Sequence, residues 1–185
     1  MRKLICRVLI FLGFKGCESQ NSNETLSLPY FGEITIEPTK DYDIFIKLED
    51  YSIPSDLNFY EETVDKTTLS CIESILNDLP AFLNKSKEIL ISNYEKLGAV
   101  KDYIEHHFEV MEKDELEQLI KNTDKNESTE RQLLSIIKIT RIGFYPDEDS
   151  HHAVFDFSIG KDYTDYRITI RYNNSGKFDS LEFVS

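Results

Sequence analysis

Between residues 154 and 184 the chain alternates apolar and polar side chains in three runs, at 154–159, 166–172 and 178–184. A period of two places the apolar members of each run on one face of a β-strand and the polar members on the other. Residues 173–176, Asn-Asn-Ser-Gly, tolerate the positive φ that a tight turn needs. These runs therefore predict a three-stranded antiparallel meander whose apolar face needs a cover.

Two further alternating runs lie near the start of the chain, at 31–37 and 42–49, and each predicts a half-buried strand. A short third strand is expected at 57–60. We expect Pro38 and Pro54 to interrupt these strands, because proline has no backbone N–H to donate to a neighbouring strand.

The spacing of apolar residues changes from two to about 3.6 after residue 65, which is typical of amphipathic helices. Pro80 suits the first turn of a helix and Gly98 suits a C-cap, so the segment divides into several helices. Polar residues at 122–129 predict an exposed loop. The helices expected are 66–79, 80–97, 99–111 and 114–121.

The apolar run at 133–145 is ambiguous, because its start suits a helix and its β-branched end suits a buried strand. We assign a strand from 136 to 144. Strands then precede and follow the helices, and this order is typical of α+β domains. The sequence therefore predicts an antiparallel sheet of about six or seven strands, with an insertion of about three or four helices packed on one face.

Composition narrows the classes of partner. The chain has 185 residues, 40% of them hydrophobic, which is enough for one domain with a packed core. Its formal net charge is −13, which disfavours nucleic acid because phosphate binding needs a cationic surface. Between residues 41 and 65 eight acidic residues are opposed only by Lys47, so this window carries a charge of −7. Such a surface suits a basic protein partner, or serves solubility alone.

The first residues differ from the rest of the chain. Basic residues come first, an apolar run follows at 8–14, and Gly16-Cys17 ends it, which is the order of a secretory leader. A cysteine after a small residue also resembles a bacterial lipoprotein signal, in which Cys17 would carry the lipid. Arg7 and Lys15 depart from that pattern.

We divide the chain into a leader and polar tether at 1–27 and a single α+β domain at 28–185. Two locations are expected. If the N-terminus is a working signal, the protein is a lipoprotein anchored to a membrane, in the periplasm or at the cell surface; if it is not, the protein is in the cytoplasm. Contact with a membrane is expected only through the lipid on Cys17, because no other stretch approaches the length of a membrane span.

Five short blocks of sequence carry a family resemblance. Together they resemble a bacterial family catalogued as domain of unknown function two-thousand-and-four, over residues 28–185. The resemblance implies an α+β domain and no established activity or catalytic residue. Small acidic domains of this general kind are sometimes immunity proteins against bacterial toxins, which is an analogy at the level of the fold. The blocks are Phe31-Gly32-Glu33-Ile34, Tyr103-Ile104-Glu105-His106-His107, Arg141-Ile142-Gly143-Phe144-Tyr145-Pro146-Asp147, Ala153-Val154-Phe155-Asp156-Phe157 and Asp165-Tyr166.

No residue pattern in the sequence predicts a catalytic site, a metal site or a cofactor. The four histidines come as adjacent pairs, which point apart on a helix or strand and lack the i, i+4 spacing of zinc ligands. His107 lies on the apolar side of its helix and is expected to be a core histidine. Cys71 is expected to be a small buried hydrophobe rather than a reactive thiol.

Two sets of polar residues are the candidates for binding. Asp147, Glu148 and Asp149 form an acidic loop that would contact a basic partner. Arg167 and Arg171 share the polar face of one expected strand. They either pair with acids across the sheet, Asp156 being the expected partner, or bind an anion.

The leading hypothesis is that the protein is a non-enzymatic, acidic interaction module. In its more specific form, the protein is an immunity-type binder of a toxin. It follows from the clustered negative charge and from the lack of a catalytic motif. The alternative is a small-molecule, anion-binding or enzymatic domain that uses the polar face of the sheet around Arg167 and Arg171.

Overall fold

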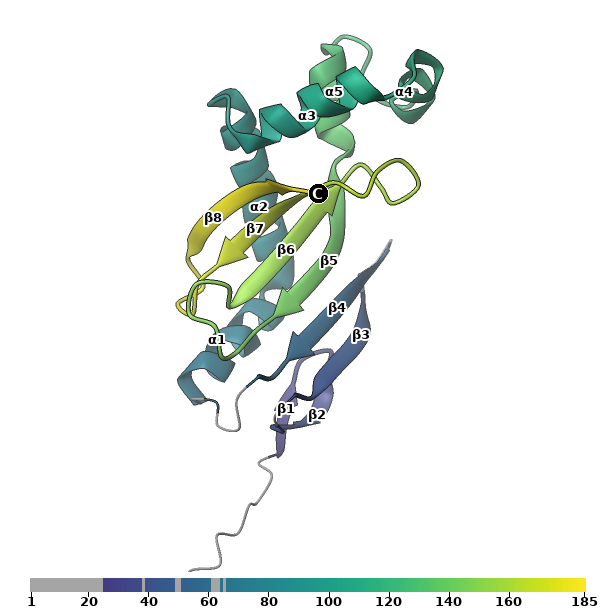
Figure 1. Ribbon diagram of the computed structural model, residues 1–185. Helices are drawn as coiled ribbons and strands as arrows, with labels where there is room; N and C mark the ends of the chain where they lie inside the picture. Colours follow the sequence, from purple (N-terminus) through teal and green to yellow (C-terminus); the bar gives the residue numbers. More distant parts are fainter. Residues whose placement is uncertain (1–24, 38, 49–50, 61–63, 65) are drawn as a thin grey trace, which may run out of the picture.

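The computed structural model describes residues 25–185 except 38, 49–50, 61–63 and 65 (Figure 1). It confirms the α+β class, because the described residues form a six-stranded sheet, a two-stranded ribbon and five helices. Cys17, the candidate for lipidation, lies outside the described residues. The strands are β1 (Thr25–Leu28), β2 (Gly32–Thr35), β3 (Asp41–Lys47), β4 (Ser52–Asn58), β5 (Lys138–Phe144), β6 (Ala153–Ser158), β7 (Arg167–Tyr172) and β8 (Phe178–Val184). The helices are α1 (Lys66–Asn77), α2 (Leu79–Glu95), α3 (Ala99–Val110), α4 (Lys113–Leu119) and α5 (Thr129–Ile136).

The six-stranded sheet has the order β3-β4-β5-β6-β7-β8, and its neighbours are antiparallel except for β4 and β5, which are parallel. The expected C-terminal meander is confirmed as β6, β7 and β8, and Gly176 has the positive φ that the last turn requires. All five helices lie between β4 and β5 in the chain, and a connection of this length allows a parallel return. The sheet is therefore mostly antiparallel, as expected, with one parallel pair.

Pro54 does not interrupt the sheet but lies inside β4, which corrects the expected break. The N–H of Phe59 bonds to the carbonyl of Lys40 on the β3 side. Along an antiparallel pair, only every second residue forms hydrogen bonds with the partner strand. Phe59 is such a residue, and Pro54 lies an odd number of residues before it, so Pro54 is at a position that donates no hydrogen bond to β3. On its other side, pairing with β5 begins only at Ser55. The missing N–H of the proline is therefore tolerated from both sides.

Helices α1 to α4 lie where the sequence predicts them, within two residues at each end. The ambiguous run is divided between α5 and β5, so the strand expected from residue 136 begins at Lys138. Ser128 explains the start of α5, because its Oγ accepts the N–H of Arg131 at 3.3 Å as an N-cap. Among the described helices, none is long and apolar enough to cross a membrane.

Helices cover one face of the sheet, and the other face is open among the described residues (Figure 1). α2 runs behind the strands, and α3 packs against β7 and β8. The covered face presents apolar members of the alternating runs, such as Ile142, Phe155 and Ile170, which are fully buried. The ribbon of β1 and β2 adds Leu28 and Ile34 to the same core. The polar residues of these strands therefore gather on the open face.

Candidate functional site

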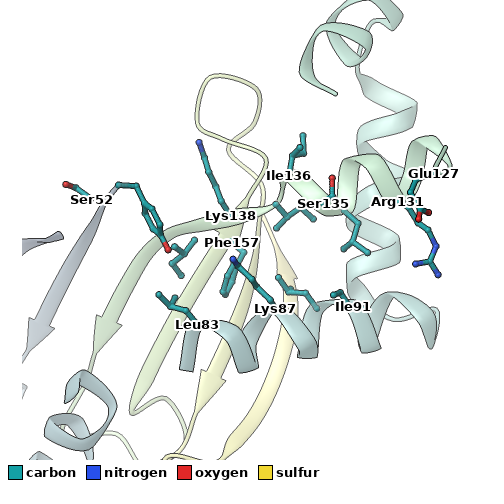
Figure 2. Close-up of a pocket in the computed structure, with 15 residues that line it drawn as sticks. Ser52, Leu83, Lys87, Ile91, Glu127, Arg131, Ser135, Ile136, Lys138 and Phe157 are labelled. Carbon is teal, nitrogen blue, oxygen red and sulfur yellow. The ribbon is translucent and has the colours of Figure 1, made fainter. Parts of the chain in front are cut away.

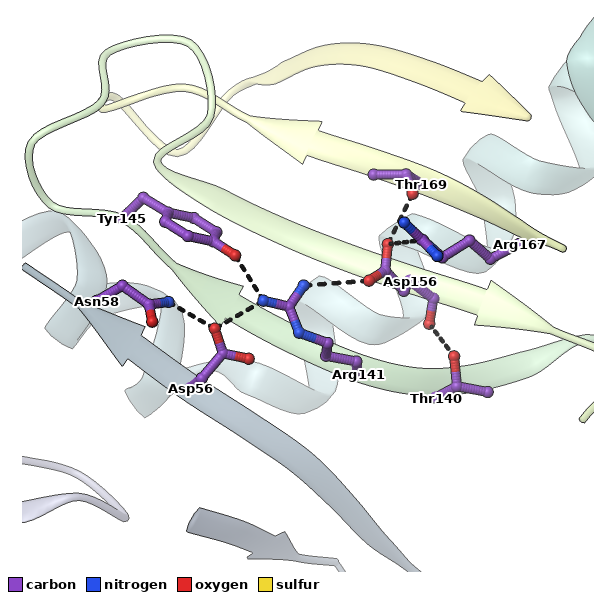
Figure 3. Close-up of polar contacts among 8 residues, drawn as sticks. All are labelled: Asp56, Asn58, Thr140, Arg141, Tyr145, Asp156, Arg167 and Thr169. Atoms are coloured by element: carbon purple, nitrogen blue, oxygen red, sulfur yellow. Dashed lines mark hydrogen bonds and ion pairs between the residues drawn. The ribbon is translucent and has the colours of Figure 1, made fainter. Parts of the chain in front are cut away.

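Arg141 of β5 lies at the centre of a polar network on the open face (Figure 3). Its guanidinium donates to Asp56 Oδ2 at 2.7 Å, to Asp156 Oδ2 at 3.2 Å and to the hydroxyl of Tyr145 at 2.5 Å. The parallel pairing of β4 with β5 brings Asp56 to this site, and the antiparallel register of β5 and β6 places Asp156 opposite Arg141. Burial alone would lower the pKa of Arg141, but the bonds to Tyr145 and Asp56 outweigh it and raise the pKa, so the side chain stays charged.

Asp156 of β6 is a buried carboxylate, 4% exposed, with a partner for each oxygen. Its Oδ1 accepts the hydroxyl of Thr169 at 2.6 Å and lies 3.7 Å from Nε of Arg167 (Figure 3). The cross-strand pairing of Asp156 with Arg167 that the sequence suggested is therefore present. A buried carboxylate is tolerated only when it is paired and hydrogen-bonded in this way.

Arg167 and Arg171, the candidates for binding an anion, lie on the same face of β7. Arg171 Nη1 is 2.7 Å from Oε2 of Glu182 on β8, so both arginines have a carboxylate within ion-pair distance. A depression of about 290 Å³ lies beside them, with Tyr145 among its lining residues. The fold brings the two arginines together, but an anion there would have to compete with Asp156 and Glu182.

A second group of residues gathers where β4 ends beside the loop that follows β5. The N–H of Tyr60 donates to Asp147 Oδ2 at 2.5 Å, and the Tyr60 ring stacks on Tyr145 with 6.2 Å between centroids and 15° between planes. Burial, and then the nearby groups Tyr145, Asp41, Glu148 and Asp56, raise the pKa of the Tyr60 hydroxyl. We call this group the acidic–aromatic patch: Asp41, Asp56, Tyr60, Tyr145, Asp147 and Glu148.

The three loop acids that the sequence proposed for partner binding have different surroundings. Asp147 holds the loop to the end of β4, and Glu148 is exposed beside it. Asp149 instead accepts from the side-chain amide of Asn174 at 2.7 Å and so ties the loop to the turn between β7 and β8. Two of the three acids therefore belong to the acidic–aromatic patch, and Asp149 lies toward the neighbouring turn.

The acidic window at 41–65 contributes two of its members to this patch, Asp41 and Asp56. Asp43 is exposed on β3, which is an edge strand of the sheet. The other five acids of the window lie outside the described residues; they are Glu49, Asp50, Glu61, Glu62 and Asp65.

Arg141, Tyr145 and Tyr60 are residues of this face that the sequence did not single out as site residues. Tyr145 belongs to one of the blocks that carried the family resemblance, but nothing in its local pattern indicated a role. A β-bulge between Ile139 and Arg141 shifts the register of β5 against β6, and Arg141 is the first residue after it. Its contact with Asp56 spans 85 residues, so only the parallel pairing of β4 and β5 reveals it.

His107 and His152 are buried, His106 and Cys71 are half-buried, and His151 is exposed. His107 Nδ1 lies 2.7 Å from the carbonyl of Tyr103, and His152 Nε2 lies 2.9 Å from the carbonyl of Thr68. Burial lowers the pKa of both histidines and raises the pKa of the half-buried Cys71 thiol. Within the part of the chain that the structure describes, no group of three or more His, Cys, Asp or Glu side chains could hold a metal ion.

The geometry therefore offers one surface of paired charges and one acidic, aromatic surface next to it. Comparisons of the chain with protein-family models, with curated proteins and with solved structures found no match. The resemblance to domain of unknown function two-thousand-and-four stays a prediction.

Proposed function

We propose that this protein is a non-enzymatic interaction module that binds a basic protein partner through the acidic–aromatic patch. The bond between the Tyr60 N–H and Asp147 is the observation that supports the proposal most. It joins the acidic window at 41–65 to the acidic loop at 147–149, which are far apart in the sequence. The sequence suggested each acidic segment separately as a contact for a basic partner, and in the structure the two segments lie side by side and form a larger surface.

The chemistry of the patch suits lysine and arginine side chains. Tyr60 is 57% exposed, so its ring is accessible to a partner's cation, and stacking on Tyr145 holds it in place. Tyrosine is enriched among the residues that dominate binding energy in protein interfaces. Carboxylates around the ring add attraction that speeds association and weakens with salt. This proposal requires no cofactor.

The second candidate is an anion-binding or enzymatic site around Arg167 and Arg171. The depression of about 290 Å³ beside these arginines favours it. The ion pairs with Asp156 and Glu182 oppose it, because they already neutralise the cations. In the acidic–aromatic patch, the exposed carboxylates of Asp41 and Glu148 form no ion pair with another residue of the described structure. Binding of a basic partner at the patch is therefore the preferred function.

The proposal is tested by capturing partners from cells that produce the protein, at low and at high salt. The variants are Glu148→Lys, which reverses an exposed charge, and Tyr60→Ala, which removes the ring but keeps the backbone N–H that Asp147 accepts. We expect a basic partner at low salt, less of it at high salt, and about tenfold weaker capture by each variant.

The matched control is Glu115→Lys, the same charge reversal at an exposed residue of α4. It should capture the partner as well as the unmodified protein does. Equal loss with Glu115→Lys, or no partner whose capture depends on Tyr60 and Glu148, would refute the patch as the binding surface.

An immunity-type role, in which the partner is a basic toxin, is the specific form of this proposal. The protein would act either anchored to a membrane through a lipid on Cys17 or in the cytoplasm. Mass spectrometry of the mature N-terminus decides between these locations. A diacylated Cys17 supports the anchored form, and an intact Met1 excludes it.

A further inference from the structure

An apolar groove lies on the other side of the sheet, between α2, α5 and the first residues of β4 and β5 (Figure 2). Its volume is about 650 Å³, and 15 residues line it. Its buried members include Leu83 and Leu90 of α2, Ile139 of β5 and Phe157 of β6. Ile91 of α2 also lines the groove and is 45% exposed, so its apolar side chain is accessible to a ligand.

The groove exists because β4 and β5 are paired over only part of their length. Ser55, Asp56 and Leu57 pair with β5, whereas the preceding residues of β4 do not. Pro54 has no N–H to extend the pairing, and the bulge after Ile139 shifts β5 at the same level. The sheet therefore opens at this end, and Tyr51 and Ile91, which line the opening, are each 45% exposed.

Positive charge surrounds this apolar surface, although the whole chain carries −13. The charged residues that line the groove are Lys87, Arg131 and Lys138 against Glu127 alone. Arg131 lies 3.6 Å from Glu95, but neither Lys87 nor Lys138 forms an ion pair with another residue of the described structure. Figure 2 shows Lys87 among the central lining residues and Lys138 at the edge of the group.

We propose that this groove binds a medium-chain aliphatic carboxylate, that is, a fatty acid. The acyl chain would lie on Leu83, Leu90, Ile91 and Phe157, and the carboxylate would pair with Lys87, with Lys138 adding to the positive potential. The volume falls in the range of small-molecule pockets, about 300–1,000 Å³. An apolar surface beside lysines without an acidic partner matches an amphiphile that has an apolar chain and a negative head group. This site is separate from the acidic–aromatic patch.

Calorimetry with octanoate, decanoate and dodecanoate, each below its micelle-forming concentration, tests the proposal on the whole chain. We expect one saturable site, with affinity rising about two- to fourfold for each added methylene group, because each buried methylene contributes hydrophobic free energy. Methyl NMR should show shifts at Leu83, Leu90 and Ile91. The absence of saturable binding, or shifts confined to other methyl groups, would overturn the proposal.

Two variants separate the carboxylate contact from the acyl-chain contact. Lys87→Glu should weaken decanoate about tenfold and leave the uncharged 1-decanol nearly unchanged, because only the charged bond is lost. Ile91→Asp, at a half-exposed position that folding tolerates, should weaken both ligands. Lys113→Glu, on an 86% exposed side chain of α4, is the matched control and should change neither.

The same variants distinguish other occupants. If Lys87→Glu and Lys113→Glu weaken decanoate equally, attraction is non-specific and the carboxylate contact is wrong. If 1-decanol binds as tightly as decanoate to the unmodified protein, the groove recognises apolar chains without the charge, and the assignment to carboxylates fails. If an acidic amphipathic peptide shifts the groove methyl groups while no carboxylate does, the occupant is a protein segment and the proposal is overturned.

Discussion

The open face of the central sheet and the apolar groove differ in whether their positively charged side chains have acidic partners. On the open face, Arg141, Arg167 and Arg171 each have a carboxylate within ion-pair distance. Beside the apolar groove, the two lysines Lys87 and Lys138 have no acidic partner in the described structure. Charges satisfied within the protein stabilise the fold, whereas unpaired charges beside an apolar surface are available to a ligand.

The ion pairs on the open face change which polar residues are candidates for binding. Conspicuous arginines on alternating strand positions suggest an anion site, yet their partners make them part of the structural network. The available groups are less conspicuous in the sequence: an exposed tyrosine among carboxylates in the acidic–aromatic patch, and two lysines at the groove. Four experiments on stability test the contrast between the two faces, from the largest expected effect to the smallest.

Phe155→Ala removes a fully buried ring from the covered face of β6 and should lower the free energy of unfolding by about 3–5 kcal/mol. Urea denaturation measures this loss. Phe45→Ala is the control on the open face of β3, where the ring is 68% exposed, and it should change the free energy by no more than about 0.5 kcal/mol. Similar losses for both variants would contradict the assignment of the two faces.

Asp156→Ala acts on the neighbouring residue of the same strand, which points to the open face. It leaves Arg141 and Thr169 without their shared partner and should cost about 2–3 kcal/mol, less than a fully buried pair because Arg141 is partly exposed to water. Asp156→Asn keeps an acceptor for Thr169 and should cost less than Asp156→Ala in the same urea assay. If the alanine variant is as stable as the unmodified protein, the network contributes nothing to the fold.

The covered face should also make stability depend on pH through its buried histidines. Burial lowers the folded-state pKa of His107 and His152, so the unfolded chain binds protons more readily. Their contribution is fully present above the ordinary histidine pKa of about 6.5 and is lost as pH falls below it. Urea denaturation at pH 7.5 and 5.5 should show a smaller loss for His107→Gln than for the unmodified protein. Equal losses in both proteins would show that His107 is not responsible.

Glu182→Gln should have the smallest effect, because Glu182 is half exposed and its ion pair with Arg171 is screened by water. The expected loss in the free energy of unfolding is less than about 1 kcal/mol and should shrink further in high salt. A loss comparable to that of Asp156→Ala would mean that the ion pair of Arg171 stabilises the fold as much as the network around Arg141 does.

Much of the fold could be predicted because it depends on local periodicity. The meander of β6, β7 and β8 and the helices α1 to α4 follow from apolar spacings of two and about 3.6. The break expected at Pro54 was wrong because whether a proline is tolerated depends on which neighbouring strand needs its N–H. No helix was assigned at 129–136, although the start of the apolar run suited one, because its apolar residues continue directly into β5.

The candidate site could be predicted only in part, because it depends on contacts between distant segments. The pairing of Asp156 with Arg167 follows from two strands that are close in the chain, and the sequence suggested it. The contacts of Arg141 with Asp56 and of Tyr60 with Asp147 span 85 and 87 residues. No local pattern encodes them, since they arise from the parallel return of β5 beside β4.

The sequence by itself therefore determined helices α1 to α4, the C-terminal meander, the α+β class and the buried face of the meander strands, because side-chain periodicity follows from backbone geometry alone. The tertiary structure decided which charges are neutralised, where the sheet opens into a groove, and which acids meet around Tyr60. These features depend on the order and register of strands joined across five helices, and many arrangements of such strands would bury the same apolar faces equally well.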